Sequence, residues 1–282
     1  MSKVANCVAD RLSSYQRIAV WGAGGLGRTA LLHWLPREKV VIVTDGNSNV
    51  IGRELPSGHR VVTPDALDAA TYDAVVICTS VHLEVRDELR RRGSKLPVHY
   101  IYELFIPASG VTNELQALTI DIAATKTQVW PLYLMTRPQV MVNITFRLTN
   151  WLALRWQLAP LYWIMWFLHH VACLLTSIQL PPGTSVGPGL IFAHYGTIVF
   201  TKRAKIGAFF TIYHGCTVGT NDSGEGPVIG DFVSQYAGSH VLGRCRIADH
   251  TRIGANAVLL NLETRPSSTV VGIPARITKR SE

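Results

Sequence analysis

The strongest constraint on the fold of this chain is a period of six residues that runs from about Leu180 to Ile277. One position in six is apolar with a single exception, at Ile229, Gln235, Val241, Ile247, Ile253 and Leu259. Four positions later the residue is small or β-branched, at Val233, Ser239, Cys245, Thr251 and Ala257. A repeat this short predicts a solenoid in which each hexad forms one short strand and three hexads close a triangular coil. We expect the larger residue to point inward and the smaller one to fill the corner beside it.

The same period begins earlier in the chain and is interrupted once. It is present at Val186, Phe192 and Ile198 and, after a slip of two residues, at Ile206, Ile212 and Val218. Residues 219–227 (GTNDSGEGP) break it, which predicts a loop that leaves the coil. A β-sandwich is the alternative, but sandwich strands alternate with a period of two and are separated by turn clusters about every 8–12 residues. This segment lacks both features, so the sequence favours the solenoid.

Four sequence runs in this region resemble a known family. They are PPGTSVGPGLIFAHYGTIV, AKIGAFFTIYHGCTVG, PVIGDFVSQYAGSHVLGRCRIADHTRIGANAV and VVGIPARI. They are similar to the left-handed β-helix domain of serine acetyltransferases and of related O-acetyltransferases in bacterial polysaccharide biosynthesis. The resemblance implies a left-handed parallel β-helix over residues 180–282 and an acyltransferase that uses acetyl-CoA as cosubstrate. It also implies a homotrimer with active sites between neighbouring solenoids.

Length and composition narrow the remaining possibilities. A chain of 282 residues is long enough for two domains, each with its own core. The net charge is +8, yet only 16% of the residues are charged and 48% are hydrophobic, which argues against a disordered or nucleic-acid-binding protein. The five cysteines show no paired spacing, so we expect free thiols and a reducing cytoplasmic location. The N-terminus lacks the apolar stretch of a signal peptide.

Residues 1–107 have the pattern of a small parallel α/β domain. Residues 17–22 form an apolar strand that leads into Gly22-Ala23-Gly24-Gly25-Leu26-Gly27 and then into a helix over residues 28–35. A second apolar strand, residues 40–43, ends near Asp45, 18 residues after Gly27. Further strands are expected at residues 60–62, 74–78 and 98–102, with a helix over 84–92. The strand–glycine turn–helix order is that of a Rossmann-like nucleotide-binding domain.

The ligand of this domain is left open by the sequence. In a dinucleotide site the glycines let backbone N–H groups approach a phosphate, and the acidic residue binds ribose hydroxyls. The candidate residues here are Gly22, Gly24, Gly27 and Asp45. The region also resembles the N-terminal domain of nucleotide-sugar acetyltransferases, where a glycine-rich turn holds a UDP-sugar. A nucleotide or nucleotide-sugar site, an NAD(P) site and a purely structural domain are the three alternatives.

Residues 108–179 are expected to form a linker and a hydrophobic helical segment. The stretch between Trp156 and Leu180 contains no Asp, Glu, Lys or Arg, and the region is rich in tryptophan, with Trp130 just before it. A helical pair buried against the solenoid or within the trimer is one interpretation. An interfacial helix in peripheral contact with the inner membrane and a membrane-spanning helix are the others.

Two histidines are candidates for the acetyl-transfer chemistry, which needs a base to take the proton of a hydroxyl. Histidine suits this role because its unperturbed pKa is near 6.5. The resemblance places His194, in Phe-Ala-His-Tyr-Gly, at the position of the family's catalytic base. His214 resembles a histidine of some family members that orients the acceptor or serves as the alternative base. His240 and His250 are expected to be solvated. None of the spacings between Cys and His residues matches a metal site.

The resemblance also indicates where CoA would lie. It points to Ala237, Gly238 and Ser239 and to Gly254 and Ala255, where small residues would let the pantetheine arm approach the backbone. Near the C-terminus, Arg276 and Lys279 would meet the CoA phosphates electrostatically, or else form a solvated tail.

The acceptor is where the sequence departs from the serine enzymes. Gln179 and Ala193 stand where the family has aspartates, and the loop at residues 221–227 lacks the family's Arg-His-Pro. Because unpaired charges in a site are costly, a neutral sugar fits better than a zwitterionic amino acid. Asn221, Asp222 and Glu225 would bind its hydroxyl groups.

The sequence therefore predicts an O-acetyltransferase that acts on a sugar or glycan precursor. Three alternatives remain: a serine O-acetyltransferase with an altered acceptor site, an amino-sugar nucleotide N-acetyltransferase, and a non-catalytic binding module that responds to a nucleotide.

Overall fold

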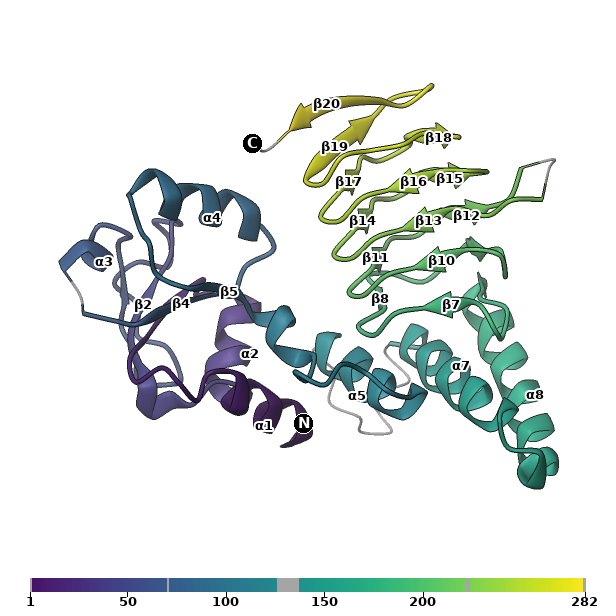
Figure 1. The fold of residues 1–282 in the computed structure, drawn as a ribbon, viewed down its shortest axis with the longest axis horizontal. Helices are drawn as coiled ribbons and strands as arrows, with labels where there is room; N and C mark the ends of the chain where they lie inside the picture. Colours follow the sequence, from purple (N-terminus) through teal and green to yellow (C-terminus); the bar gives the residue numbers. More distant parts are fainter. Residues whose placement is uncertain (1, 70, 126–136, 222–223, 281–282) are drawn as a thin grey trace. The chain divides into compact units, whose positions relative to one another are not determined.

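The computed structural model describes residues 2–69, 71–125, 137–221 and 224–280. The chain divides into two compact units, Met1–Gly110 and Val111–Glu282. Figure 1 shows the first as a mixed helix and sheet unit and the second as a tall coil of strands with helices at one end.

The first unit is built on five parallel strands in the order β3-β2-β1-β4-β5. The strands are β1 (Ile18–Trp21), β2 (Val40–Thr44), β3 (Val61–Val62), β4 (Ala74–Ile77) and β5 (Val98–Tyr100). The helices are α1 (Ser2–Arg11), α2 (Gly25–His33), η1 (Arg37–Lys39), α3 (Ala66–Ala69), α4 (His82–Arg91) and η2 (Ile101–Phe105). Every residue of β1 and β4 is buried, as expected for central strands of a parallel sheet.

Several element boundaries in this unit differ from the predicted ones by one to three residues, and two of these differences have a visible cause. The helix expected from residue 28 begins at Gly25, because the glycine-rich turn itself forms the first turn of α2. The strand expected to reach residue 102 ends at Tyr100, where the Glu103 carboxylate accepts a hydrogen bond from the Tyr100 amide and starts the 3-10 helix η2.

The second unit is a solenoid of three parallel sheets, which fits the coil that the six-residue period predicts. One sheet contains β7 (Ser185–Val186), β10 (Lys205–Ile206), β13 (Val228–Ile229) and β16 (Arg246–Ile247). The next contains β8 (Ile191–Phe192), β11 (Thr211–Ile212), β14 (Ser234–Gln235), β17 (Arg252–Ile253), β19 (Ser268–Val271) and the antiparallel β20 (Arg276–Arg280). The third contains β6 (Ile178–Gln179), β9 (Ile198–Phe200), β12 (Thr217–Gly219), β15 (His240–Leu242) and β18 (Val258–Leu260).

The inward positions of the solenoid form its core, including the one polar exception. The predicted inward aliphatic residues, among them Ile212, Val241 and Ile253, are buried, except that Val186 in the first coil is partly buried. Gln235 is also fully buried, and its Nε2 donates to the carbonyl oxygens of Thr217 (3.2 Å) and Ser239 (2.9 Å). Its side chain therefore ties two successive coils together from the inside.

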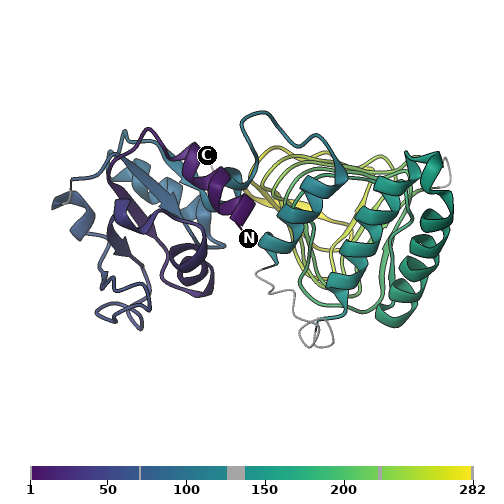
Figure 2. The ribbon, with the colours of Figure 1, turned by 90° about the horizontal axis from the view of Figure 1, so that it is seen from below.

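Three helices cover the end of the solenoid where the first coil begins. They are α5 (Glu114–Ala124), α7 (Gln139–Ala153) and α8 (Ala159–Thr176), the last preceded by the short η3 (Trp156–Leu158). Figure 2 shows these teal helices in front of the strands when the coil is viewed from below. Val142, Phe146 and Ala172 belong to the same apolar cluster as the inward residues of the first coils. The helices thus act as a cap that keeps water from the core.

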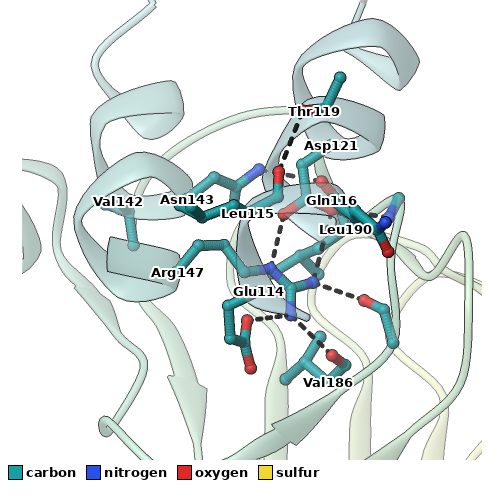
Figure 3. Close-up of polar contacts among 12 residues, drawn as sticks. Glu114, Leu115, Gln116, Thr119, Asp121, Val142, Asn143, Arg147, Val186 and Leu190 are labelled. Atoms are coloured by element: carbon teal, nitrogen blue, oxygen red, sulfur yellow. Dashed lines mark hydrogen bonds and ion pairs between the residues drawn. The ribbon is translucent and has the colours of Figure 1, made fainter. Parts of the chain in front are cut away.

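A buried ion pair fastens the cap to the first coil (Figure 3). The Arg147 guanidinium donates to Asp121 (Nε to Oδ2, 2.8 Å) and to the carbonyl oxygens of Val186 (2.8 Å) and Gly187 (2.5 Å). Asp121 Oδ1 accepts from the amides of Gly189 (2.6 Å) and Leu190 (2.9 Å). Both charged side chains are buried, and both satisfy backbone groups at the start of the solenoid.

Within one chain, the two long helices of the hydrophobic segment are buried to different extents. α7 is largely buried, but α8 packs through one face only, formed by His169, Ala172 and Thr176. Within the described ranges, one helix, Trp156–Thr176, is long and apolar enough to cross a membrane, with a mean hydropathy of 1.5 and 11% of that window buried. Trp130 lies outside the described residues.

Candidate active site

The two candidate histidines lie in line on one corner of the solenoid. This corner, which we call the histidine corner, consists of residues 193–197, 213–216, 236–239 and 254–257, where each coil turns from the second sheet to the third. Strand register pairs Phe192 with Ile212, Ile212 with Gln235, and Gln235 with Ile253. The residues two positions after each strand end are His194, His214, Ala237 and Ala255, and they therefore form one stripe along the surface.

The two imidazoles of this stripe are neighbours. Their ring centroids are 5.7 Å apart at an interplanar angle of 72°, and both side chains are exposed. Both rings can thus reach a single hydroxyl group at the surface, one as a base and the other as a hydrogen-bond partner. The outward position predicted for His194 is confirmed.

A second stripe, of tyrosines, runs beside the histidines. Tyr213 and Tyr236 stack at a centroid distance of 5.1 Å, and the Tyr213 ring lies 5.9 Å from the His194 ring. Burial raises the pKa of Tyr213, and the neighbouring Tyr236 raises it further. These tyrosines were not among the residues predicted for the site. The signal for them was present, because each directly follows an inward residue of successive coils, in Ile-Tyr-His and Gln-Tyr-Ala.

The residues expected to bind CoA divide into two groups in the structure. Ala237 and Ala255 lie at the surface of the histidine stripe. Gly238 and Gly254 are required by the coil itself, because an added Cβ at Gly238 would overlap Asn256 Oδ1 and one at Gly254 would lie 2.7 Å from Val271 Cγ1. Ser239 is buried and donates its hydroxyl to the Tyr236 carbonyl oxygen (2.6 Å), so its side chain faces the interior.

The two C-terminal cations belong to the last strand. Arg276 is exposed in β20, and Lys279 lies in the same strand. Their proposed contact with CoA phosphates stays a prediction.

The expected acceptor loop lies at a different corner from the histidines. The loop connects β12 of the third sheet to β13 of the first, and there Glu225 forms an ion pair with Arg244. Asn221 Oδ1 accepts from the Glu225 amide (3.3 Å). Asp222 lies outside the described residues. Within one chain, therefore, Asn221 and Glu225 do not share a corner with His194.

The glycine-rich turn of the first unit has mainly internal partners. Gly22 has a φ of +123°, and a Cβ added at Gly27 would overlap the Gly22 carbonyl oxygen. Asp45 Oδ2 accepts from the Ala23 amide (2.7 Å), and its Oδ1 accepts from the Asn47 amide (2.8 Å). Gly24 is different, because nothing lies within 4 Å of the Cβ position. Across the described parts of both units, no group of three or more His, Cys, Asp or Glu side chains could hold a metal ion.

Comparisons with known proteins place this arrangement in a family, although no family model matches the chain. A serine acetyltransferase of Helicobacter pylori (strain J99) is 36% identical over 150 residues, which are 52% of this chain and 85% of that protein. A serine acetyltransferase of Mycobacterium tuberculosis is 37% identical over 112 residues, and there the chain spans about half (48%) of the relative's length. The soybean serine acetyltransferase apoenzyme structure aligns with a TM-score of 0.50 and 25% identity, covering 59% of this chain and 69% of that one. The chain belongs to the serine acetyltransferase family of hexapeptide-repeat acetyltransferases.

Proposed function

We propose that the protein is an acetyl-CoA-dependent O-acetyltransferase with His194 as its general base. The observation that supports this most directly is the single stripe of His194, His214, Ala237 and Ala255 on one corner of the coil. In the proposed reaction, the His194 imidazole accepts the proton of the acceptor hydroxyl while the oxygen attacks the thioester carbonyl carbon. The carbon–sulfur bond then breaks, and the CoA thiolate leaves and takes up the proton.

The small residues of the stripe suit the cosubstrate. Because Ala237 and Ala255 project no side chain beyond Cβ, an extended pantetheine arm has room beside the backbone on the coils that follow the histidines. The arm would then present its thioester at the histidine end of the stripe. We expect a neighbouring copy to close the site, as in the trimer that the resemblance implies, and we place the enzyme in the cytoplasm.

L-Serine is the first candidate acceptor, because the relatives that establish the family are serine acetyltransferases. A sugar hydroxyl is the second candidate, and the histidine corner itself favours it. The four segments of this corner contain no Asp, Glu, Lys or Arg, so they offer no counter-charge for the ammonium or carboxylate of serine. The stacked Tyr213 and Tyr236 rings instead offer an apolar wall with hydroxyl tips.

The acceptor test compares L-serine with free and nucleotide-linked sugars, using the full chain and acetyl-CoA and following release of free thiol. Serine-dependent release supports the first candidate, and sugar-dependent release with an acetyl ester in the product supports the second. An acetamide product would indicate N-acetylation instead. If no acceptor raises thiol release above the rate of acetyl-CoA hydrolysis, the proposed function is wrong and the binding-module alternative gains support.

The general base is tested with His194→Asn. Removing a general base typically lowers turnover by about 10²- to 10⁴-fold, and we expect a loss of that size in kcat. His250→Asn is the matched control, because His250 is also a solenoid histidine but lies between β16 and β17, at a different corner from His194. If His194→Asn retains the activity of the control, His194 is not the base.

A ligand of the first unit remains a separate proposal. The open space at Gly24, at the N-terminus of α2, is where a nucleotide or nucleotide-sugar phosphate would approach. The engagement of Asp45 with the turn favours a structural role for that carboxylate over ribose binding.

A further inference from the structure

One face of α8 is apolar and exposed in the second unit. It consists of seven large side chains, each between 45% and 80% exposed: Leu161, Trp163, Ile164, Phe167, Leu168, Leu174 and Leu175. At 100° per residue these positions cover an arc of about 160° on the helix surface. His169, Ala172 and Thr176, which are buried, lie on the other side of the helix. A helix that is apolar around most of its circumference is normally covered on every side, so this face is expected to have a partner.

The packed side of α8 argues against a helix that crosses a membrane. The buried His169 ring hydrogen-bonds to the Leu180 carbonyl oxygen (2.8 Å) and to the Thr145 hydroxyl (3.0 Å). Moving α8 into a bilayer core would break these bonds and would uncover the Ala172 contact with the solenoid core. The helix therefore has one side fixed to the cap and one side available, which is the geometry of a helix that lies along a surface.

The available side is better suited to lipid than to a second protein chain. Protein interfaces carry roughly one hydrogen bond per 100–200 Å², and six of the seven exposed side chains have no hydrogen-bonding group. A facing helix also covers a seam narrower than this arc, whereas a bilayer surface covers all of it. Trp163 adds a side chain of the kind enriched at membrane interfaces.

The charge of the second unit points to anionic lipid. Residues 111–282 contain 14 Lys and Arg residues against 8 Asp and Glu residues. None of these charges lies within α8, and Arg155 precedes it by one short turn. A unit with a net positive charge and an uncharged apolar helix favours a negatively charged headgroup layer, which attracts the unit while the apolar side chains enter the boundary.

We propose that α8 docks the protein on the surface of an anionic lipid bilayer through this exposed face, with the helix axis along the membrane plane. The proposal is independent of the acceptor and of His194. It assigns the hydrophobic segment a binding role, whereas the other two interpretations of the sequence bury it in protein or pass it through the membrane.

Vesicle cosedimentation of the full chain tests the proposal. We expect the protein to sediment with phosphatidylcholine vesicles that contain about one-third phosphatidylglycerol, and less with phosphatidylcholine alone, because the attraction includes the headgroup charge. The double variant Ile164→Asn, Phe167→Asn should lower the partition coefficient at least tenfold. The matched control is Leu260→Asn, Ile273→Asn, which removes two exposed apolar side chains (61% and 72%) from the solenoid and should sediment like the original protein.

Two further measurements separate the outcomes. Acetyl transfer and thermal unfolding of both double variants should match the original protein, because all four positions are exposed, and this shows that the variants fold. Sedimentation velocity without lipid reports whether a second copy covers α8. The proposal is overturned if the protein ignores anionic vesicles, if both double variants bind them equally, or if Ile164→Asn, Phe167→Asn lowers the oligomer mass while vesicle binding is absent.

Discussion

Arg147 is the side chain on which the junction between cap and solenoid depends most. It is 1% exposed and binds Asp121, Glu114 and two carbonyl oxygens of the first coil. Replacing one member of a buried pair leaves the other charge uncompensated, which typically costs about 3–5 kcal/mol. We therefore expect Arg147→Met to lower the unfolding free energy of the second unit by that amount, as measured by hydrogen exchange of α7 amides.

Arg244→Ala is the control for that measurement. Arg244 forms an ion pair with Glu225 in the same unit, but its side chain is 68% exposed, and surface pairs of this kind contribute about 0–1 kcal/mol. If Arg147→Met changed stability no more than Arg244→Ala does, the buried pair would not be what holds the cap in place.

His169 makes the stability of the cap dependent on pH. Burial lowers the pKa of its imidazole, whereas the unfolded chain titrates near pH 6.5. As the pH falls, the imidazole therefore takes up its proton first in the unfolded chain. The contribution of the neutral His169 ring to the unfolding free energy is fully present above about pH 6.5. It decreases as the pH drops toward the pKa of the folded state. We expect the unfolding temperature of the second unit to fall between pH 7.5 and 5.5.

The size of this pH effect is checked with two neighbouring variants. His169→Gln should have a lower unfolding temperature at pH 7.5, but its unfolding temperature should change less with pH. His170→Gln alters the adjacent, exposed histidine and should keep the slope of the original protein. Equal slopes in all three proteins would assign the pH dependence to other groups.

Sequence periodicity predicted correctly whether a side chain is exposed or buried where its position in the coil decides this. His194 faces outward, and the small residues Val233, Cys245 and Ala257 are buried at corners, as expected. The proximity of His194 to His214 was not predicted, although it follows from the two-residue slip, which pairs Phe192 with Ile212 in adjacent coils. Ser239 shows the reverse error, since a small corner residue looked available to a ligand and is turned inward.

The glycine-rich turn before α2 contains one glycine that the packing requires and one that it does not. Gly27 leaves no room for a Cβ beside the Gly22 carbonyl oxygen, whereas the Cβ position of Gly24 is open. We expect Gly27→Ala to destabilise the first unit by about 1–3 kcal/mol through overpacking. Gly24→Ala should change stability by only about 0.5 kcal/mol or less. Urea unfolding of the two variants side by side measures the difference.

The same pair of variants tests the ligand proposed for this turn. A bound nucleotide-sugar would raise the unfolding temperature of the original protein. Gly24→Ala would reduce that shift, because the added methyl group occupies the space where a phosphate would approach. A shift that Gly24→Ala leaves intact would place the ligand elsewhere.

The strands of the solenoid were predictable because each hexad repeats the same pattern, an inward apolar residue and a small corner residue. The cap helices were harder to predict. α5 has a readable start, since Asn113 accepts from the amides of Leu115 (3.1 Å) and Gln116 (3.0 Å), but tertiary contacts decide which side of each helix is buried. The sequence of α8 fits burial, an interface and a membrane equally, whereas the structure shows which side of it is packed, through His169, Ala172 and Thr176.

For the molecule as a whole, the trimer that the resemblance implies would explain how the proposed acceptor residues could serve a site that contains His194. If Asn221 and Glu225 serve the site, they must come from a neighbouring copy, because within one chain they lie at another corner. We expect light scattering to give three times the 31.1 kDa of one chain. Mixing His194→Asn chains with Glu225→Ala chains should then restore part of the activity that each variant lacks alone. Full activity in a monomer would contradict shared sites.

The stripe on the histidine corner has a fixed spacing, because successive coils repeat the same geometry. Parallel strands in adjacent coils are about 4.8 Å apart, so the span from the imidazoles of His194 and His214 to Ala237 and Ala255 is fixed in whole steps. Inserting one complete 18-residue turn between residues 219 and 228 would lengthen that span by one step and leave each corner unchanged. If the pantetheine arm lies along this stripe as proposed, its thioester would then stop short of His194, and we expect catalysis to be lost in a protein that still folds.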